Sequence, residues 1–600
     1  MTQYMKPTNK LIDYVNRFGG WNPQFLREIK GKLTIKNVIV ITTIAIFSQL
    51  FIVIANLAKL PDASQEISHN SSELIYSAIP QYSRYCIGKA SDSLLCHQDM
   101  HNNWVINWQL FWFDIFVTLS VIGTVLLLVL GTYLLINNAI AEQKQGTLNL
   151  IRLSPQSAES ILVGKILGVP ILLYLFVALG LPLQIISGLQ ANLSLSLVIA
   201  FDLAVMASCA FFYSVGLLVS FVANKSVVSW GVAIAIAFFL GLTTILNLDH
   251  YQSNTQTLLD WLLLFNPLNL IIYIGQTTGI PYHHFDYPDF GFFGSYLSGY
   301  DYDKNYIEPI ALSNLLFYGK ALWTKVGFGI GLMIANHCLW SYWIWQGLKR
   351  RFYNPENTAI SKQQSYWITG YCVAVALGFS LQGTENGQGT GEWLFFNIIL
   401  VQLLLLILFL GFTFALSPQH QTLQDWARYR HQMGNKRSVL WRELILGEKS
   451  PSTFAIAINI LIATLYIIPS LIIFPFDDMA ISAFWGLILT MGMVLFYSAI
   501  VQWILFSKSN HKEIIASGVI ISLIVLPPLL LSLKGLYVGE APLTWMFTFV
   551  PYAAIEYATP CTIALGILGQ WLAITLVSLQ MTRQLRQAGR SESYRILKNG

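Results

Sequence analysis

Residues 142–155 read Glu142-Gln-Lys-Gln-Gly146-Thr147-Leu-Asn-Leu-Ile-Arg-Leu-Ser154-Pro155, and Gln-Ser-Ala-Glu-Ser-Ile-Leu-Val-Gly-Lys165 follows directly. It is a polar segment between two long apolar runs, and it re-enters an apolar run almost at once. Ser154-Pro155 predicts a helix start, because serine can cap a helix and proline at the first helical position has no amide hydrogen to lose. The residues before it mix apolar and charged types, which indicates an amphipathic element along a membrane surface.

The composition of the chain indicates a membrane protein. Of its 600 residues, 55% are hydrophobic and only 11% are charged, a balance outside the usual range for soluble proteins. Apolar runs of about twenty residues recur along the chain, and each can cross a hydrocarbon core of about 30 Å. We expect twelve spans, near residues 37–57, 111–136, 161–188, 192–222, 226–247, 322–346, 366–382, 393–415, 453–474, 480–506, 513–533 and 561–580. The predicted fold is an all-α, polytopic helical membrane protein.

The positions of Lys and Arg predict how the chain is oriented. With the N-terminus inside, the expected inner segments carry 27 of the 35 Lys and Arg residues, and the outer loops carry 6. Such residues are retained on the cytoplasmic side of a membrane. We therefore expect cytoplasmic N- and C-termini and a prokaryotic inner membrane as the location. The same retention charges account for the basic ends of the chain, so we expect no nucleic-acid partner.

The stretch 137–165 resembles the first cytoplasmic loop of permease subunits in the type-2 ABC exporter family. In that family a Glu, a Gly-Thr pair, a Ser-Pro and a Gly-Lys recur in this order before the third span. The matching positions here are Glu142, Gly146, Thr147, Ser154, Pro155 and Lys165. The resemblance implies that this loop is the coupling element that docks on a separate ATPase subunit. An ordinary interfacial connector between two spans is the alternative interpretation.

A second pattern indicates an internal duplication. The residues Leu259, Trp261, Phe265, Pro267, Ile271 and Tyr273 recur as Leu543, Trp545, Phe549, Pro551, Ile555 and Tyr557, always 284 positions later. Each set follows the fifth expected span of its half and precedes the sixth. The chain is then predicted to be two fused six-span halves of parallel orientation, residues 1–355 and 356–600, with the long outer loop 248–321 in the first half.

The Trp, Pro and Tyr residues of this repeat predict short elements at the outer surface, each broken by its proline. The resemblance implies that they help to close the outer end of the transport path. These outer gate residues are Trp261, Pro267 and Tyr273 in the first half, and Trp545, Pro551 and Tyr557 in the second. An interfacial belt of aromatic residues is compatible with the same pattern.

The second half departs from the family pattern in its cytoplasmic loop. That loop reads Trp441-Arg-Glu443-Leu-Ile-Leu-Gly447-Glu-Lys-Ser450-Pro451 and lacks the Gly-Thr pair. Glu443 and Gly447 have the spacing of Glu142 and Gly146, and Ser450-Pro451 mirrors Ser154-Pro155. We expect a second coupling loop here, which docks its ATPase less typically or contacts something else.

The chain contains no nucleotide-binding motif. Gly164-Lys165 is followed by Ile and lacks the earlier, spaced glycine of a phosphate-binding loop. We therefore expect no enzymatic activity and no cofactor in this chain, with ATP and Mg²⁺ bound by the partner subunit. No metal site is predicted either, because Asp301-x-Asp303-x-Asn305 lacks the glycine and the closing glutamate of a calcium loop.

Few other polar residues are candidates for a function. Asp202 lies deep in an expected span and His337 lies midway along another; ionisable groups are costly there, which makes both functional candidates. A hydrogen bond to a neighbouring helix is the structural alternative for Asp202. Cys86 and Cys96, in the outer loop 58–110, can form a disulfide on an oxidising side of the membrane or remain free thiols.

These patterns predict the permease subunit of an ABC-type exporter, moving a lipidic, amphipathic or glycan-linked substrate. The expected partners are ABC-type ATPase subunits and membrane lipids. Three alternatives stay open. One is a transporter driven by an ion gradient, which would depend on Asp202. Another is a membrane-embedded enzyme, for which His283, His284, Asp286 and Asp289 form the single cluster, in no catalytic pattern. The third is a scaffold protein that moves nothing.

Overall fold

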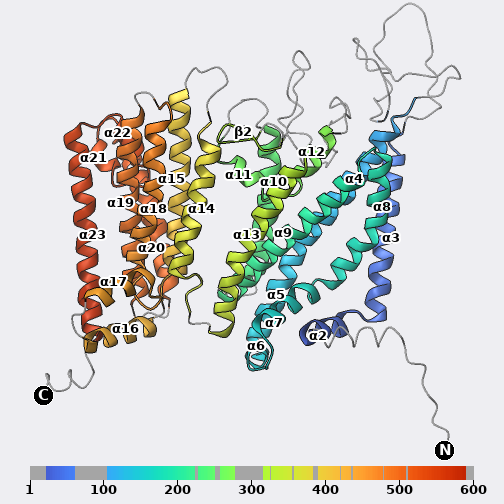
Figure 1. The fold of residues 1–600 in the computed structure, drawn as a ribbon, viewed down its shortest axis with the longest axis horizontal. Coiled ribbons are helices and arrows are strands. Elements are labelled where there is room, and N and C mark those ends of the chain that lie inside the picture. The colour runs from blue at the N-terminus through green and yellow to red at the C-terminus, as the bar shows by residue number, and fades with distance from the viewer. Residues whose placement is uncertain are drawn as a thin grey trace, which may run out of the picture. The chain divides into compact units, whose positions relative to one another are not determined.

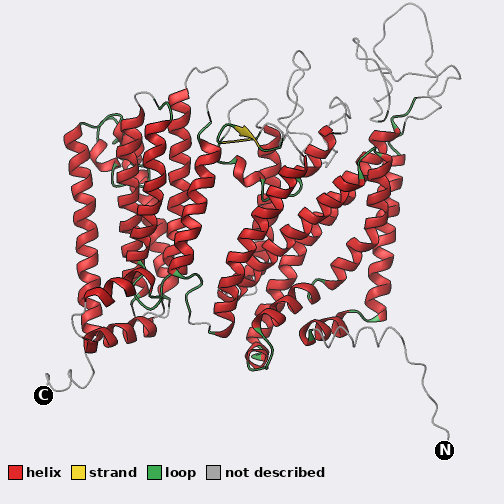
Figure 2. Ribbon diagram, in the orientation of Figure 1, coloured by secondary structure: helices red, strands yellow, loops and turns green. Residues whose placement is uncertain are grey.

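The structure is a computed structural model of the chain, and its described residues are almost entirely helical (Figure 1, Figure 2). It describes residues 22–60, 85, 105–222, 227–249, 257–277, 315–323, 326–354, 357–382, 390–418, 420–433, 437–476, 479–507 and 511–589. The chain forms two compact units. Unit 1 comprises residues 1–252, 263–315 and 322–342, and unit 2 comprises residues 253–262, 316–321 and 343–600.

Ten of the described helical segments are long and apolar enough to cross a membrane, by length and composition. The all-α, polytopic fold is thus confirmed. Two of the twelve expected spans, 322–346 and 366–382, are helical but are not among these ten. The first carries Asn336 and His337 at its middle, and the helix around the second begins with Lys362-Gln-Gln, so both are more polar than the others.

Unit 1 contains a short helix that precedes the first span, and then the spans themselves. Its helices are α2 (Pro23–Lys32), α3 (Ile35–Leu57), α4 (Trp108–Val125), the π-helical turn η1 (Leu126–Leu130), α5 (Gly131–Lys144), α6 (Thr147–Arg152), α7 (Ala158–Gly168), α8 (Ile171–Gln190), α9 (Leu195–Val222), α10 (Val227–Asp249) and α12 (Asn269–Thr277). The helix α11 (Asp260–Leu263) and the long helix α13 (Val326–Tyr353) cross the boundary between the units.

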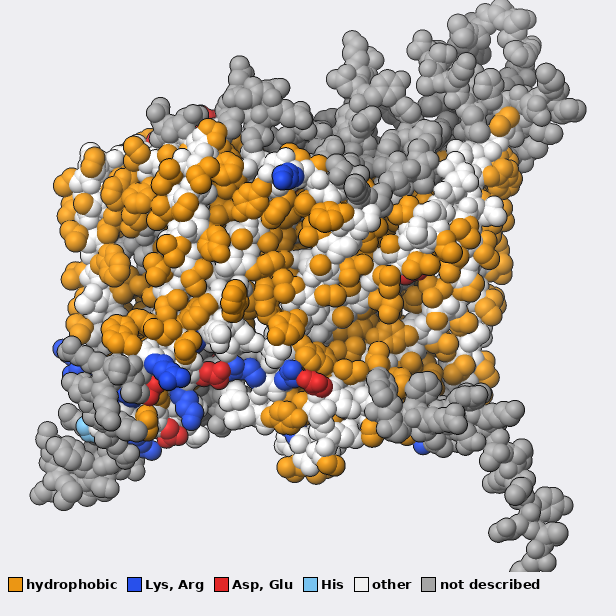
Figure 3. Space-filling model, in the orientation of Figure 1, with side chains coloured by type: hydrophobic (Ala, Val, Ile, Leu, Met, Phe, Trp, Pro, Cys, Tyr) orange, Lys and Arg blue, Asp and Glu red, His pale blue; other side chains and the backbone are white. Residues whose placement is uncertain are grey.

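Unit 2 contains the remaining helices. They are α14 (Lys362–Ser380), α15 (Thr390–Ala415), α16 (His420–Met433), α17 (Arg437–Leu446), α18 (Thr453–Ile473), α19 (Met479–Leu505), α20 (Lys512–Leu533), α21 (Pro542–Trp545), α22 (Tyr552–Ile555) and α23 (Pro560–Gly589). Hydrophobic side chains cover the lengths of the helices, and Lys and Arg side chains gather at the end that bears α16 and α17 (Figure 3).

The helices of the two units follow the same order and pack in corresponding pairs. In unit 1, α3 packs on α8 and α5 packs on α9; in unit 2, α14 packs on α18 and α15 on α19. A further match at the offset of 284 lies in α9 and α19, where Phe212-Tyr213-Ser214 recurs as Phe496-Tyr497-Ser498. This common order supports a duplication, and the boundary at residue 355 stays a prediction.

The third expected span, 161–188, is not one helix. It breaks at Val169-Pro170 into α7 and α8, because proline has no amide hydrogen and its ring clashes with the preceding turn. The carbonyl group of Ile166, which loses its usual partner, accepts a hydrogen bond from the Tyr174 hydroxyl at 3.0 Å. The carbonyl of Val169 accepts one from Lys32 Nζ at 3.0 Å. Side-chain donors therefore satisfy the hydrogen-bonding capacity of both backbone carbonyl groups at this break.

A small hairpin from the outer loop of the first half belongs to unit 2. Its strands β1 (Leu316–Phe317) and β2 (Lys320–Ala321) pair antiparallel. Tyr318 and Gly319 form its turn with positive φ angles of 47° and 74°, as a two-residue turn of this kind requires. The Tyr318 amide donates to the Gly378 carbonyl of α14 at 2.9 Å, and the Gly319 amide donates to Gln382 Oε1 at 3.0 Å. The hairpin is thus fixed to the end of α14.

Candidate coupling site

The predicted coupling loop forms a turn between α5 and α7, with α6 at its tip. Gly146 adopts a left-handed backbone with φ 72°, which glycine reaches without steric cost. Thr147 follows it, and its hydroxyl donates to the Glu142 carbonyl near the end of α5 at 3.2 Å. The Gly-Thr pair therefore makes the sharp turn that reverses the chain from α5 into α6.

Glu142 and Lys165 are joined in this site. The Lys165 ammonium forms a buried ion pair with the Glu142 carboxylate and also donates to Asn138 Oδ1 at 3.2 Å. Both charged side chains are almost fully buried. A buried charge pair of this kind is costly to split, since the remaining partner would stay buried without compensation. The pair fastens the end of α5 to the middle of α7.

The helix α2 lies along α7 and was not expected from the sequence. Its N-cap Asn22 accepts a hydrogen bond from the Phe25 amide and donates to the Ser160 carbonyl of α7 at 2.6 Å. Two glycines of α7 leave the space for it. A Cβ atom at Gly164 would lie 2.7 Å from Asn22 Oδ1, and one at Gly168 would lie 2.5 Å from the Glu28 Cβ. The helices α2 and α7 therefore form one tightly packed pair.

Ser154 does not start a helix, so this part of the prediction is wrong. Its hydroxyl donates to the Ile151 carbonyl at 2.7 Å and closes the end of α6. The next helix begins at Ala158, and its N-cap is Ser157, whose side chain accepts from the Ser160 amide at 3.2 Å. Ser154 and Ser157 are three residues apart, and of the two it is Ser157 that caps the N-terminus of α7. Pro155 lies in the short link between α6 and α7.

The tip of this element exposes apolar side chains. Leu150 of α6 is 70% exposed and Leu153, just after it, is 83% exposed. Leu148, on the opposite side of the same short helix, is buried. Hydrophobic side chains are visible at the tip formed by α6 in Figure 3. Exposed apolar residues on a firmly held support are typical of protein docking surfaces.

The predicted second coupling loop has a different construction. Glu443 of α17 accepts a hydrogen bond from Trp426 Nε1 at 3.1 Å, and Gly447 does not share the left-handed backbone of Gly146. Ser450 again closes the preceding helix, since its hydroxyl donates to the Glu443 and Gly447 carbonyls at 2.7 and 3.0 Å. Pro451 follows, and α18 begins at Thr453.

A buried lysine holds this second loop. Lys362, at the start of α14, donates from Nζ to Ser450 Oγ at 2.6 Å and to the Leu444 and Pro451 carbonyls at 2.8 and 3.1 Å. Its side chain is buried, and burial lowers the pKa of Lys362 to about 7. Beside it, Arg350 binds the Glu448 carboxylate through both guanidinium nitrogens. No sequence pattern identifies Lys362 as a candidate, because its partners are mainly backbone carbonyls.

The outer gate residues of the first half are buried. In unit 1 the Tyr273 hydroxyl donates to the Trp323 carbonyl at 3.1 Å. Pro267 separates α11 from α12, and side chains hold the chain on both sides of it. The Asn266 amide group donates to the Leu240 carbonyl at 3.0 Å, and the Asn269 amide group donates to the Leu263 carbonyl at 3.2 Å. In unit 2, Trp261 lies edge to face with Tyr371 at a ring distance of 6.4 Å.

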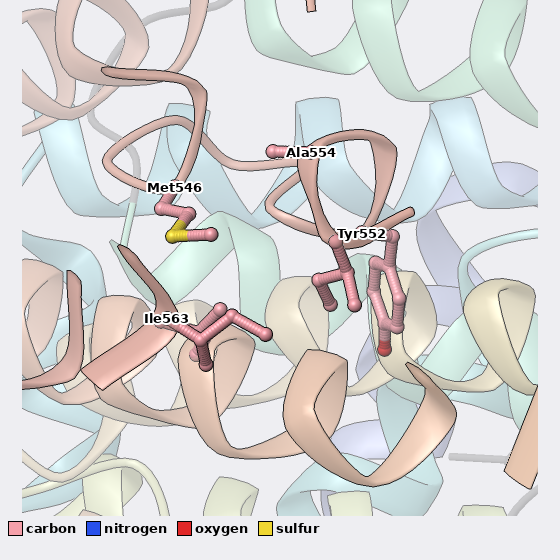
Figure 4. Packing of buried hydrophobic residues seen from close by; sticks show 6 residues of the cluster. Met546, Tyr552, Ala554 and Ile563 are labelled. Carbon is pink, nitrogen blue, oxygen red and sulfur yellow. The ribbon is translucent and has the colours of Figure 1, made fainter. Parts of the chain in front are cut away.

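The matching segment of the second half packs through other residues. Met546 and Tyr552 anchor α21 and α22 in a cluster with Ile563 and Ala554 (Figure 4). Trp545 donates to the Leu536 carbonyl at 2.9 Å, and Pro551 is buried. Tyr557 is 57% exposed, whereas Tyr273 is only 3% exposed. The repeat thus fixes the position of these elements but does not give their tyrosines the same surroundings.

The polar residues within the spans have helix neighbours. Gln184 of α8 donates from Nε2 to Asp202 Oδ1 at 3.2 Å and to Ser120 Oγ at 3.1 Å. His337 contacts Ser208 Oγ at 3.1 Å and the Met333 carbonyl at 2.9 Å. Cys86, Cys96 and the cluster from His283 to Asp289 lie outside the described residues.

Comparison with known families decides the identity of the first half. The family model described as ABC-2 family transporter protein matches residues 25–280. Residues 25–280 belong to the ABC-2 transporter family. The match begins in α2 and includes every residue of the predicted coupling loop. With ten described helices long and apolar enough to cross a membrane, the chain is an integral multi-pass membrane protein. No curated protein and no solved structure matches the chain.

Sequence reasoning missed two groups of candidate residues at this site. The first is Asn22, Glu28 and Lys32 of α2, for which Asn22-Pro23 was an available signal of a helix start. The second is the pair Leu150 and Leu153 at the tip. The periodicity of apolar residues does not show whether an exposed leucine pair packs on another protein, so it could not identify this pair as a docking site.

Proposed function

We propose that this chain is the membrane subunit of an ABC-type exporter, driven by ATP that a separate ATPase subunit hydrolyses. The observation that carries the proposal is the element α5–α6–α7. It is fastened internally by the buried pair Glu142–Lys165, it is packed along α2, and it presents Leu150 and Leu153 to solvent. A rigid support with an exposed apolar tip is suited to transmit a force from a docked partner.

The energy source has to lie in another chain. The sequence has no phosphate-binding loop, and Gly164-Lys165 is occupied by packing on α2 and by the ion pair with Glu142. ATP and Mg²⁺ are therefore assigned to the partner subunit. The side of the membrane that bears α6 is assigned to the cytoplasm, in agreement with the distribution of Lys and Arg.

The substrate class follows from the scarcity of charge inside the helices. Asp202 is the single carboxylate deep in an expected span, and Gln184 already donates to it. A lipidic, amphipathic or glycan-linked substrate fits such a path better than a small ion does, because ions require replacement of their hydration shell. Transport driven by an ion gradient is the second candidate, and it depends on Asp202.

The test is a pull-down of the tagged full-length chain in a mild detergent, with mass spectrometry and an ATPase assay of the eluate. An ABC-type ATPase in stoichiometric amount is expected with the wild-type chain. The double variant Leu150→Asp, Leu153→Asp should lose it, because a charged tip cannot be desolvated in a docked interface. Leu446→Asp, at an exposed leucine within the predicted second loop, reports whether that loop also docks.

Two results would contradict the proposal. A well-folded wild-type sample without any ATPase would favour the gradient-driven transporter, and Asp202→Asn should then abolish transport. Normal recovery of the ATPase with the double variant would show that α6 is not the docking tip.

A further inference from the structure

The coupling element, which consists of α5, α6 and α7, lies between two irregular points in the second and third expected spans. Before it, the second span contains the π-helical turn Leu126–Leu130 between α4 and α5. After it, the third span breaks at Val169-Pro170 between α7 and α8. A π-helical turn and a proline break both weaken the regular hydrogen-bond ladder, and both are recurrent sites of bending.

A tyrosine hydroxyl holds each of these points. Tyr213 of α9 is fully buried and donates to the Leu127 carbonyl, inside the π-helical turn, at 2.8 Å. Tyr174 of α8 donates to the Ile166 carbonyl, which Pro170 leaves without its helical partner, at 3.0 Å. At each irregular point of unit 1, a tyrosine hydroxyl therefore satisfies one backbone carbonyl.

The approach of Tyr213 depends on a glycine. A Cβ atom at Gly131, the first residue of α5, would lie 2.2 Å from the Tyr213 hydroxyl. No side chain other than hydrogen fits there while the hydroxyl stays on Leu127. Gly131 and Tyr213 thus form a matched pair at the point where α5 leaves the π-helical turn.

The second unit carries the same tyrosine without this arrangement. Tyr497 of α19 lies 284 positions after Tyr213 and is also buried. Among the described residues its hydroxyl has no hydrogen-bond partner. The helix α15, which corresponds to the second span, is α-helical throughout its described length, and α18 is continuous from Thr453 to Ile473. The tyrosine is therefore present in both units. The π-helical turn Leu126–Leu130 and the break at Val169-Pro170, which we call the two joints, are features of unit 1.

We propose that α5, α6 and α7 move as one body about these two joints, and that Tyr213 and Tyr174 are positioning residues which keep the joints in register. The ion pair Glu142–Lys165 makes the body rigid, and α2 moves with α7. The movement that couples the docked ATPase to transport, here called the coupling stroke, then passes through unit 1. This inference rests on the proposed function, because a stroke requires a docked ATPase.

Hydrogen exchange of the purified full-length chain tests the joints without any ATPase. Tyr213→Phe keeps the ring and removes the hydroxyl, so the amides of residues 126–135 should exchange about tenfold faster, in proportion to the lost hydrogen bond. Tyr497→Phe is the matched control, since it removes a hydroxyl that has no partner in the described part of the chain, and exchange should not change. Equal effects of the two variants, or no effect of Tyr213→Phe, would overturn the joint.

A second variant covers the case in which Tyr213→Phe fails to fold. Pro170→Ala restores an amide that can donate to the Ile166 carbonyl, so α7 and α8 should become continuous and exchange more slowly around residue 170. With the ATPase bound, this variant should retain binding but lose ATPase stimulation and transport several-fold. Unchanged stimulation with slower exchange would overturn the stroke. The absence of an ATPase from the wild-type sample would instead overturn the proposed function and the stroke together, and the exchange result would still decide the joint.

Discussion

The ammonium group of Lys165 lies against the carboxylate of Glu142, although 22 residues, including the whole of α6, separate them in the chain. Their side chains are 1% and 7% exposed, so water cannot replace either partner. The pair is a direct ionic link between the two helices that flank α6.

We expect removal of one charge from this pair to be worse than removal of both. Glu142→Leu or Lys165→Met should lower the free energy of unfolding by about 3–5 kcal/mol, because the remaining charge stays buried without a partner. The double variant Glu142→Leu, Lys165→Met should recover most of this loss. Thermal unfolding of the three variants in detergent checks it, and an additive double variant would show that the two groups do not interact.

The packing of α2 on α7 predicts an effect of a single methyl group. Gly164→Ala places its Cβ against Asn22 Oδ1 and, at 2.9 Å, against the backbone nitrogen of Phe25, which cannot move cheaply. The helix α2 should loosen, and trypsin should cut after Arg27, Lys30 or Lys32 faster than in the wild type. Gly180→Ala in α8, where nothing lies within 4 Å, should leave the cleavage rate unchanged. Similar rates for both variants would argue against the clamp.

The hairpin Leu316–Ala321 predicts a contrast between two glycines of α14. A Cβ at Gly378 would lie 2.1 Å from the Phe317 ring, whereas at Gly370 the nearest atom is 3.9 Å away. Gly378→Ala should therefore displace the hairpin and cost about 1–3 kcal/mol, the range found for overpacked sites. Gly370→Ala should be nearly neutral. The melting temperatures of the two variants provide the comparison, and equal values would contradict the packing of the hairpin.

The buried ammonium of Lys362 predicts how stability depends on pH. Burial lowers the pKa of Lys362 from 10.5 to about 7, and the Glu448 carboxylate offsets part of that shift. Between these two values the folded chain binds fewer protons than the unfolded chain, so the free energy of unfolding should rise with pH across this window. Lys362→Met should lack this contribution. The wild type should gain melting temperature relative to this variant between about pH 7 and about pH 10; parallel curves would exclude the effect.

The proposed orientation predicts where introduced cysteines are labelled. Ser450 is unsuitable as a site, since it is fully buried beside Lys362. Ser157 and Lys449 are exposed near the two predicted coupling loops, and cysteines there should react with a membrane-impermeant reagent from the cytoplasm only. A background with the native cysteines replaced by serine removes competing signals. Labelling from outside at either position would overturn the orientation and the parallel repeat.

The helical class of this protein could be predicted from its sequence, because burial in lipid demands long apolar runs and little else. The uniform apolarity of these runs also conceals local features such as helix breaks. Pro170 lies within one of these runs and was read as part of a continuous span, since apolarity does not report hydrogen bonding. Tyr213 is one of 28 tyrosines, and nothing in its neighbourhood distinguishes it from an ordinary residue of an apolar helix.

The coupling residues illustrate a second limit. Glu142, Gly146, Thr147 and Lys165 match a family resemblance, and the structure gives each a physical role. Glu142 and Lys165 form an ion pair, Gly146 makes a left-handed turn, and the Thr147 hydroxyl closes the end of α5. Ser154 was identified in the same way but was given the wrong role, because capping of the next helix and closure of the previous one use the same side chain. Local sequence does not decide between them.

The hairpin and residues 253–262 belong to unit 2 although they precede the predicted boundary at residue 355. A gene divided at that boundary would encode a first polypeptide that carries pieces of the second one's packing. Tyr318 would still need Gly378, and Trp261 would still need Tyr371, from a separate molecule. Two such polypeptides should be obligate complements of each other, and fusion of the halves would then be irreversible in evolution, since the first half has given part of its chain to the packing of the second.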